Sequence, residues 1–410
     1  VGDGAAVQCT FVNETLCPAS WTVTTADELA GCIALANNNE SPSPTADTIT
    51  LGADIDLTTL TTSPLPQIAS EITLEGANYF IDGGNSVQLF SVDTSGDFTV
   101  NQATLQNGSA TQGGGIFNDS YGTLTVTNST ISGNTATDSG GGIFNGAYGT
   151  VTVTNSTISG NTATGTPSYG GGIASFNGTV TVTNSAISNN TATSGGGIYL
   201  SRGTATVTDS TISGNSATNG GGINMNSYGT VTVTNSTISG NSATNGGGIL
   251  NGGTVTVTDS IIVGNSATNG GGGINNNYTL TVTNSTFSRN SATNGGGIIS
   301  SGAASTLTVT NSTFSRNRAD FGGGGIYINT GTATVTNSTF SRNTAITSGG
   351  GIYNADSTLT VTTSTFSGNS ADDFGGGIYK EFGTVYLAGV ILDHGSGENC
   401  YGFNFTDNGY

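Results

Sequence analysis

Residues 150–154 read Thr-Val-Thr-Val-Thr, residues 157–161 read Thr-Ile-Ser-Gly-Asn, and residues 170–173 read Gly-Gly-Gly-Ile. This pattern decides the fold because it returns along most of the 410-residue chain. Three glycines followed by isoleucine occur eleven times, with 24 to 30 residues between successive isoleucines. A fixed period of this length indicates stacked copies of one supersecondary unit. The isoleucines are Ile116, Ile143, Ile173, Ile198, Ile223, Ile249, Ile274, Ile298, Ile326, Ile352 and Ile378.

Each repeat predicts three short strands. Alternation of Thr and Val has the period of a strand with one buried face, so Val151 and Val153 should point inward. Further strands are expected around Ile158 and Ile173, with turns at Asn161 and at the glycines. Coils of about 26 residues, stacked roughly 4.8 Å apart, would pair their backbones and close a narrow core. We therefore predict an all-β parallel β-helix. A leucine-rich repeat has a similar period, but Leu is scarce and no helical segment separates the strands.

The chain divides into four predicted regions. Residues 1–46 hold an N-terminal segment and a capping helix, 47–108 irregular first coils, 109–380 the regular repeats, and 381–410 a C-terminal coil and tail. Thr25 and Glu28 have the spacing of a capping box. Leu29, Cys32, Ile33 and Ala36 follow at helical spacing. An amphipathic helix here would seal the open end of the β-helix.

One asparagine per repeat falls at a turn, and we expect these side chains to hydrogen-bond from coil to coil as a structural ladder. No cofactor is expected. The ladder residues are Asn134, Asn161, Asn190, Asn215, Asn241, Asn265, Asn290, Asn317, Asn343 and Asn369.

Composition excludes several function classes. The net charge is −19, with Lys380 the single lysine, so nucleic acid binding is not expected. The sequence contains no run of 18 apolar residues, so we predict no membrane-spanning helix. We interpret Val1 as a mature start after cleavage of a signal peptide. The expected location is extracellular, at the cell surface.

The N-terminal region resembles a known module. Residues 29–33 read Leu-Ala-Gly-Cys-Ile, and residues 72–76 read Ile-Thr-Leu-Glu-Gly. Together with Asp47-Thr48-Ile49 they resemble the module of secreted bacterial proteins named after a Cys-Ser-Leu-Arg-Glu-Ala-Ile motif, although Asp27 stands where that motif has its first Cys. The Gly-Gly-Ile and Phe-x-x-Asn pairs resemble repeats of the polymorphic outer-membrane proteins. Both resemblances imply an extracellular right-handed β-helix of surface structure or adhesion, and neither implies a reaction.

An enzyme is not expected, and we predict no catalytic or metal-binding residues. Polysaccharide lyases need a basic residue and hydrolases need two facing carboxylates. Arg289, Arg316 and Arg342 share one repeat position and are interpreted as a solvated stripe. The single histidine, His394, has no nucleophile motif before it. A polysaccharide lyase or hydrolase is therefore only a minor alternative.

Two surface features suggest binding. Outward threonines form a row that resembles ice-binding proteins, although Thr also simply suits exposed strands. Asn-x-Ser/Thr sequons are frequent, and glycans need exposed acceptors. The threonine row is Thr125, Thr152, Thr181, Thr206, Thr232, Thr256, Thr281, Thr308, Thr334 and Thr360. The glycosylation candidates are Asn13, Asn107, Asn118, Asn177, Asn277 and Asn404.

The preferred functional hypothesis is a rigid secreted rod of the cell surface or matrix that assembles head to tail with copies of itself. The alternative is an adhesin that binds glycans or other cells through the side of the β-helix. Tyr401, Phe403 and Phe405 alternate and would give an aromatic face for assembly.

The four cysteines, Cys9, Cys17, Cys32 and Cys400, suit an extracellular disulfide chemistry. Three lie at one end of the predicted rod and one at the other, too far apart for a bond within one chain. We expect Cys17 to pair with Cys32, and Cys9 with Cys400 of the next molecule; a free, buried Cys400 is the alternative.

Non-reducing gel electrophoresis of the denatured native material tests this link between molecules. A ladder of bands that collapses on reduction is expected. A lone monomer band without reductant would rule the covalent link out.

Overall fold

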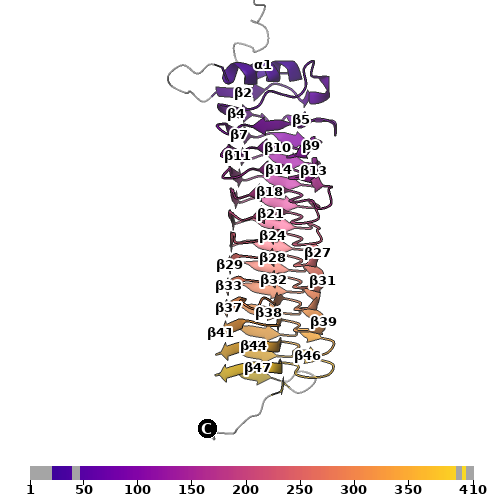
Figure 1. The fold of residues 1–410 in the computed structure, drawn as a ribbon, viewed down its shortest axis with the longest axis vertical. Coiled ribbons are helices and arrows are strands. Elements are labelled where there is room, and N and C mark those ends of the chain that lie inside the picture. Colours follow the sequence, from indigo (N-terminus) through magenta and orange to yellow (C-terminus); the bar gives the residue numbers. More distant parts are fainter. Residues whose placement is uncertain (1–20, 39–46, 394–398, 403–410) are drawn as a thin grey trace, which may run out of the picture.

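The computed structural model describes residues 21–38, 47–393 and 399–402. The chain winds into an elongated rod of stacked coils, with helix α1 (Ala26–Ala36) across one end and the last coils at the other (Figure 1). All pairings along its sides are parallel. One side is a sheet of fourteen strands, from β3 (Ile55–Asp56) to β48 (Ile391–Asp393), so there are about fourteen coils. The predicted all-β solenoid with a short N-terminal helix is confirmed.

A single coil shows how the repeat folds. It runs through β14 (Ile143–Asn145), β15 (Thr150–Thr154), β16 (Thr157–Ser159) and β17 (Thr162–Ala163). The three predicted strands are present, and a fourth short segment, β17, pairs as well. Ala163 in β17 is buried, which explains why a small apolar residue recurs after the turn asparagine. This segment was not predicted, because two to five residues are too few to show a strand period.

Register is held from coil to coil. β15 pairs with β11 (Thr123–Thr127) and β19 (Thr179–Thr183), which aligns Val153 with Val126 and Val182. These valines are fully buried, whereas the threonines between them face outward. Later in the rod the core contains stacked phenylalanine rings. Phe287, Phe314, Phe340 and Phe366 have successive ring centroids 4.8, 4.9 and 4.6 Å apart. The narrow core is therefore built of columns of like side chains.

Glycine is required in the three-glycine motif of each repeat for two different reasons. Gly170 has φ +62°, a left-handed conformation that favours glycine. At Gly172 the conformation is ordinary, but a β-carbon would lie 2.6 Å from the carbonyl oxygen of Gly197 in the next coil. Close approach of neighbouring backbones, as well as the turn, therefore fixes this motif.

The turn asparagines are buried and form a continuous hydrogen-bond ladder. In Asn241, Nδ2 donates to the Ile212 carbonyl and to Oδ1 of Asn265, both at 3.0 Å. Its own Oδ1 accepts from the backbone N–H and the Nδ2 of Asn215, at 2.9 and 3.0 Å. Each amide thus satisfies backbone groups at a turn where no strand partner exists.

Helix α1 covers the N-terminal end. Thr25 caps it by accepting from the Glu28 N–H at 3.2 Å, while the Glu28 carboxylate accepts from the Thr24 N–H at 2.7 Å. The latter bond is the main reason that the pKa of Glu28 is lowered. Leu29, Cys32, Ile33 and Ala36 are buried beneath the helix, as its spacing predicted. The core at this end is therefore shielded from water.

The other end is less covered in the part of the chain that the structure describes. Strand β47 (Ile378–Ala388) pairs with β44 (Ile352–Thr362), and only β49 (Cys400–Tyr401) pairs beyond it. The core-facing positions Val385, Leu387 and Leu392 are only partly buried here. The last described coil therefore lacks the second neighbour that every inner coil has.

Replacement of Val233 by Asp should place an unpaired carboxylate in the closed core and lower the free energy of unfolding by several kcal/mol. Thr232→Asp, on the outward side of the same strand β25 (Thr230–Thr234), should change it by less than about 1 kcal/mol. Thermal or chemical unfolding measures both, and equal stability of the two variants would contradict the inward assignment.

Asn241→Ala should destabilise the fold by roughly 2–4 kcal/mol, because it removes the side chain of one ladder position and leaves buried backbone groups unpaired. The control is Asn235→Gly, at an exposed turn with φ +47°, which glycine adopts without strain. Denaturant unfolding of both variants is the measurement. An Asn241→Ala protein as stable as the control would show that the ladder does not contribute.

Candidate functional site

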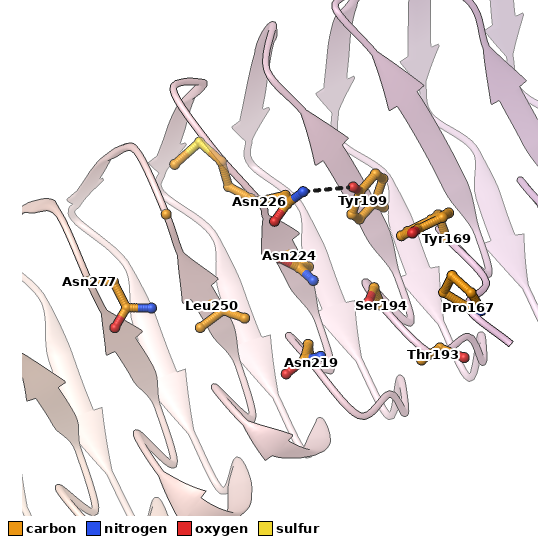
Figure 2. A pocket seen from close by; sticks show the side chains of 12 residues that line it. Pro167, Tyr169, Thr193, Ser194, Tyr199, Asn219, Asn224, Asn226, Leu250 and Asn277 are labelled. Carbon is orange, nitrogen blue, oxygen red and sulfur yellow. Dashed lines mark hydrogen bonds between the residues drawn. The ribbon is translucent and has the colours of Figure 1, made fainter. Parts of the chain in front are cut away.

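One side of the rod carries a groove of about 400 Å³, which we call the amide groove (Figure 2). Its lining is mostly amide, hydroxyl and aromatic side chains. The lining residues are Pro167, Tyr169, Thr193, Ser194, Tyr199, Asn219, Asn224, Met225, Asn226, Leu250, Gly252 and Asn277. None of these side chains is charged.

The floor comes from three neighbouring strands, β21 (Ile198–Ser201), β24 (Ile223–Met225) and β28 (Ile249–Asn251). Each begins with the isoleucine of the glycine motif, which is buried. The next residue therefore points outward by strand alternation. Register aligns Tyr199, Asn224 and Leu250 in one column along the rod axis. The groove floor is thus the outward column of the strands that follow the glycines.

One wall depends on an irregular coil. The interval from Ile143 to Ile173 is 30 residues, the longest in the chain, and its extra residues include Pro167 and Tyr169. The backbone of Tyr169 pairs with that of Ser194 in a β-bridge, and Ser194 pairs with Asn219 in the same way. These three residues therefore follow one another along the wall, one per coil. An insertion in one repeat therefore adds lining residues at one end of the groove (Figure 2).

Aromatic rings form that end. The Tyr169 and Tyr199 rings lie 4.6 Å apart, and Phe176 lies 5.6 Å from Tyr199. The Tyr199 hydroxyl accepts a hydrogen bond from Asn226 Nδ2 at 3.2 Å, as Figure 2 shows. Burial raises the pKa of the Tyr199 hydroxyl above its usual range. The end of the groove is a fixed aromatic platform.

Asn224 is the unusual residue of the floor. Its side chain is only 4% exposed, and its Oδ1 has no hydrogen-bond partner. Asn275 occupies the same column two coils further on, is 8% exposed, and also has an unpartnered Oδ1. A buried acceptor without a partner costs about 1–3 kcal/mol. The hydrogen bonds within the fold leave these two amide oxygens unpaired.

The sequence analysis did not find this site. Its signal was the residue after each repeat isoleucine, which is Phe, Tyr, Leu or Ile in most repeats but Asn at 224 and 275. Among the described residues no three His, Cys, Asp or Glu side chains gather to hold a metal ion. No helix in the described ranges is long and apolar enough to cross a membrane.

The glycosylation candidates separate into different environments. Asn177 and Asn277 are exposed. Asn107 is half-buried, and its Nδ2 donates to Asp82 at 2.8 Å. Asn118 is wrong as a candidate, because it is fully buried and its Nδ2 donates to Gly122 and Asn145 inside the coil. Asn13 and Asn404 lie outside the described residues.

The cysteine and assembly candidates lie mainly at the ends. Cys32 is buried on the inner face of α1, while Cys9 and Cys17 are outside the described residues. Cys400 is a half-buried free cysteine in β49. Tyr401 stacks on Phe374 of its own chain, with ring centroids 4.3 Å apart. Phe403, Phe405 and His394 lie outside the described residues, so the predicted aromatic face stays a prediction.

The threonine row lies in register on the strands equivalent to β15, beside uncharged threonine neighbours on the same strands. The arginine stripe is exposed at turns that precede the asparagine ladder. Arg289, Arg316 and Arg342 have φ between +54° and +55°, where other repeats place glycine. These three side chains do not line the amide groove.

The architecture defines the chain as a parallel β-solenoid with an uncharged groove on one side. A family model described as a right-handed β-helix region matches residues 87–266, 172–340 and 221–400. These ranges together span most of the chain, and the protein therefore belongs to the right-handed β-helix family. A search of curated proteins and a search of solved structures gave no significant match.

Burial raises the pKa of the Cys400 thiol to about 11. In the folded protein this thiol should react with iodoacetamide at pH 8 roughly a hundredfold more slowly than an ordinary thiol, since the thiolate is the nucleophile. The rate should rise up to about pH 11, and unfolding should restore an ordinary thiol. Mass spectrometry of the Cys400 peptide measures the rate, and equal rates in native and denatured protein would contradict this placement.

Proposed function

We propose that this protein is a secreted β-helical rod of the cell surface or extracellular matrix that binds neutral glycans in the amide groove. The single observation that carries the proposal is Asn224. Its Oδ1 is buried without a partner at the groove floor, next to the Tyr169 and Tyr199 platform. A half-turn of the amide would bring this oxygen to the groove, where a sugar hydroxyl would donate to it.

The chemistry of the lining matches a sugar. Pyranose rings present apolar C–H faces that pack on aromatic rings, and hydroxyls that both donate and accept hydrogen bonds. Tyr199 and Tyr169 offer the first kind of contact, while the amides of Asn219, Asn226 and Asn277 offer the second. A pocket of convergent polar groups with an aromatic wall is the usual form of a small-ligand site.

Charge favours a neutral ligand. The groove contains no charged side chain, and the net charge of −19 would repel acidic polysaccharides. The lining also supplies no carboxylate or imidazole for acid–base catalysis. We therefore propose a role in binding rather than in cleavage. The resemblance of residues 29–33 and 72–76 to a module of secreted bacterial proteins supports the extracellular location.

The head-to-tail filament is a second proposal, supported by the described C-terminal coil. Phe382, Tyr386 and Ile391 are 60–63% exposed there, which is unusual for aromatic and branched side chains. At the opposite end α1 covers the core, so such a contact would meet a helix rather than a free strand edge. The side groove carries the stronger case, because its floor holds the unpaired Oδ1 of Asn224.

Asn224→Leu tests the glycan site with a matched residue, since Leu250 occupies the same column one coil later. The variant should weaken binding of neutral oligosaccharides by about tenfold, the worth of one or two hydrogen bonds. It should also raise the free energy of unfolding by about 1 kcal/mol, because an unpartnered amide is removed. Isothermal titration with xylo-, manno-, gluco- and chito-oligosaccharides and thermal unfolding give the two readings.

The control is Tyr386→Thr, which removes an exposed tyrosine from the last described coil and continues the register of Thr360. It should leave binding unchanged. Polygalacturonate serves as the acidic ligand and should not bind. Absence of binding to every neutral oligosaccharide, or unchanged affinity in Asn224→Leu, would refute the proposed site.

A further inference from the structure

A second aromatic cluster lies on the same column as the groove floor. Beyond Leu250 the column continues through Asn275 and Ile299 to Tyr327 in β40 (Ile326–Ile328), and then to Tyr353. The Tyr327 and Tyr353 rings stack with centroids 4.7 Å apart, and Phe321 lies 5.8 Å from Tyr353. The floor column therefore runs from one aromatic platform to another.

The wall also runs from an aromatic residue to an aromatic residue. From Tyr169 it passes through Ser194, Asn219 and Asn245, then through Gly270, Asn294 and Gly322, and it ends at Ser348 and Phe374. Phe374 is 45% exposed and packs with Tyr379 and Tyr401. Floor and wall thus both begin and end with aromatic rings. Between these rings the floor alternates Asn224 and Asn275 with Leu250 and Ile299, and the wall carries hydroxyl, amide and glycine positions.

The unpartnered amides fall between the two platforms. Asn224 and Asn275 each bury an Oδ1 without a partner, and they lie two coils apart on the floor. From Tyr199 to Tyr327 there are five coil steps, which is about 24 Å at roughly 4.8 Å per coil. The rise of roughly 4.8 Å per coil is close to the length that one sugar adds to an extended polysaccharide, so each coil would face about one sugar.

We infer that the amide groove is the first part of a longer track, and that its ligand is a linear neutral polysaccharide in an extended conformation, lying along the rod axis. The inference rests on the proposed glycan-binding function and adds the form and direction of the ligand. A straight column of sites matches an extended β-1,4-linked chain. A helical α-1,4-linked glucan would leave the column after a few sugars.

The chain-length dependence of binding tests the track. The probes are β-1,4-linked gluco- and manno-oligosaccharides from disaccharide to octasaccharide, with maltooligosaccharides of the same lengths for comparison. Affinity for the β-1,4-linked series that binds should rise by roughly tenfold from trisaccharide to octasaccharide, as the ligand reaches the second platform. Maltooligosaccharides should show no such rise.

The matched variant is the double substitution Tyr327→Ile and Phe374→Ser, which copies the register neighbours Ile299 and Ser348. It should abolish the gain of the octasaccharide and leave trisaccharide affinity unchanged, while Tyr386→Thr changes neither. A melting curve close to that of the parent shows that the double variant is folded.

The outcomes separate the two proposals. If the groove binds a trisaccharide but longer chains gain nothing, or if the double variant keeps the gain, the track is wrong and the groove site stands. If no neutral oligosaccharide of any length binds, the glycan site itself is wrong and the track falls with it.

Discussion

The in-register parallel stacking of coils is the constraint on which this structure depends. Because each backbone pairs with the coil above and the coil below, every residue meets its own counterpart in neighbouring repeats. Like side chains then form columns, and the residue types that stabilise the rod are those whose stacked copies interact favourably. Asparagine amides donate and accept in turn, phenylalanine rings stack, and glycines let two backbones approach closely.

The same constraint explains where a site can arise. A regular column presents one chemistry along the whole rod, so a local site needs a break in the repeat. Two kinds of break meet at the amide groove. The long coil before Ile173 adds Pro167 and Tyr169 as an end wall, and Asn224 replaces the apolar or aromatic residue of the floor column. The first shapes the groove, and the second places an unpartnered polar atom in it.

That unpaired oxygen distinguishes Asn224 from the asparagines of the ladder. In the ladder, Asn241 has partners for both its oxygen and its nitrogen, so its burial stabilises the turn. Asn224 is almost as buried, yet its oxygen has no partner. Natural folds accept such local costs mainly where a ligand repays them. Asn241 and Asn224 thus have similar burial and differ in their hydrogen-bond partners.

The sequence by itself determined the solenoid, its period, its inward valines, its asparagine turns and its capping helix. Each of these follows from local spacing that repeats, and repetition makes a weak local signal strong. The tertiary structure alone decided the fourth paired segment, the burial of Asn118 and the amide groove. These depend on which side chains from different coils line one groove, as Pro167 and Asn277 do at its opposite ends (Figure 2). A period shows which residues share a column; only the packed coils show which columns lie side by side and which buried atoms are left without a partner.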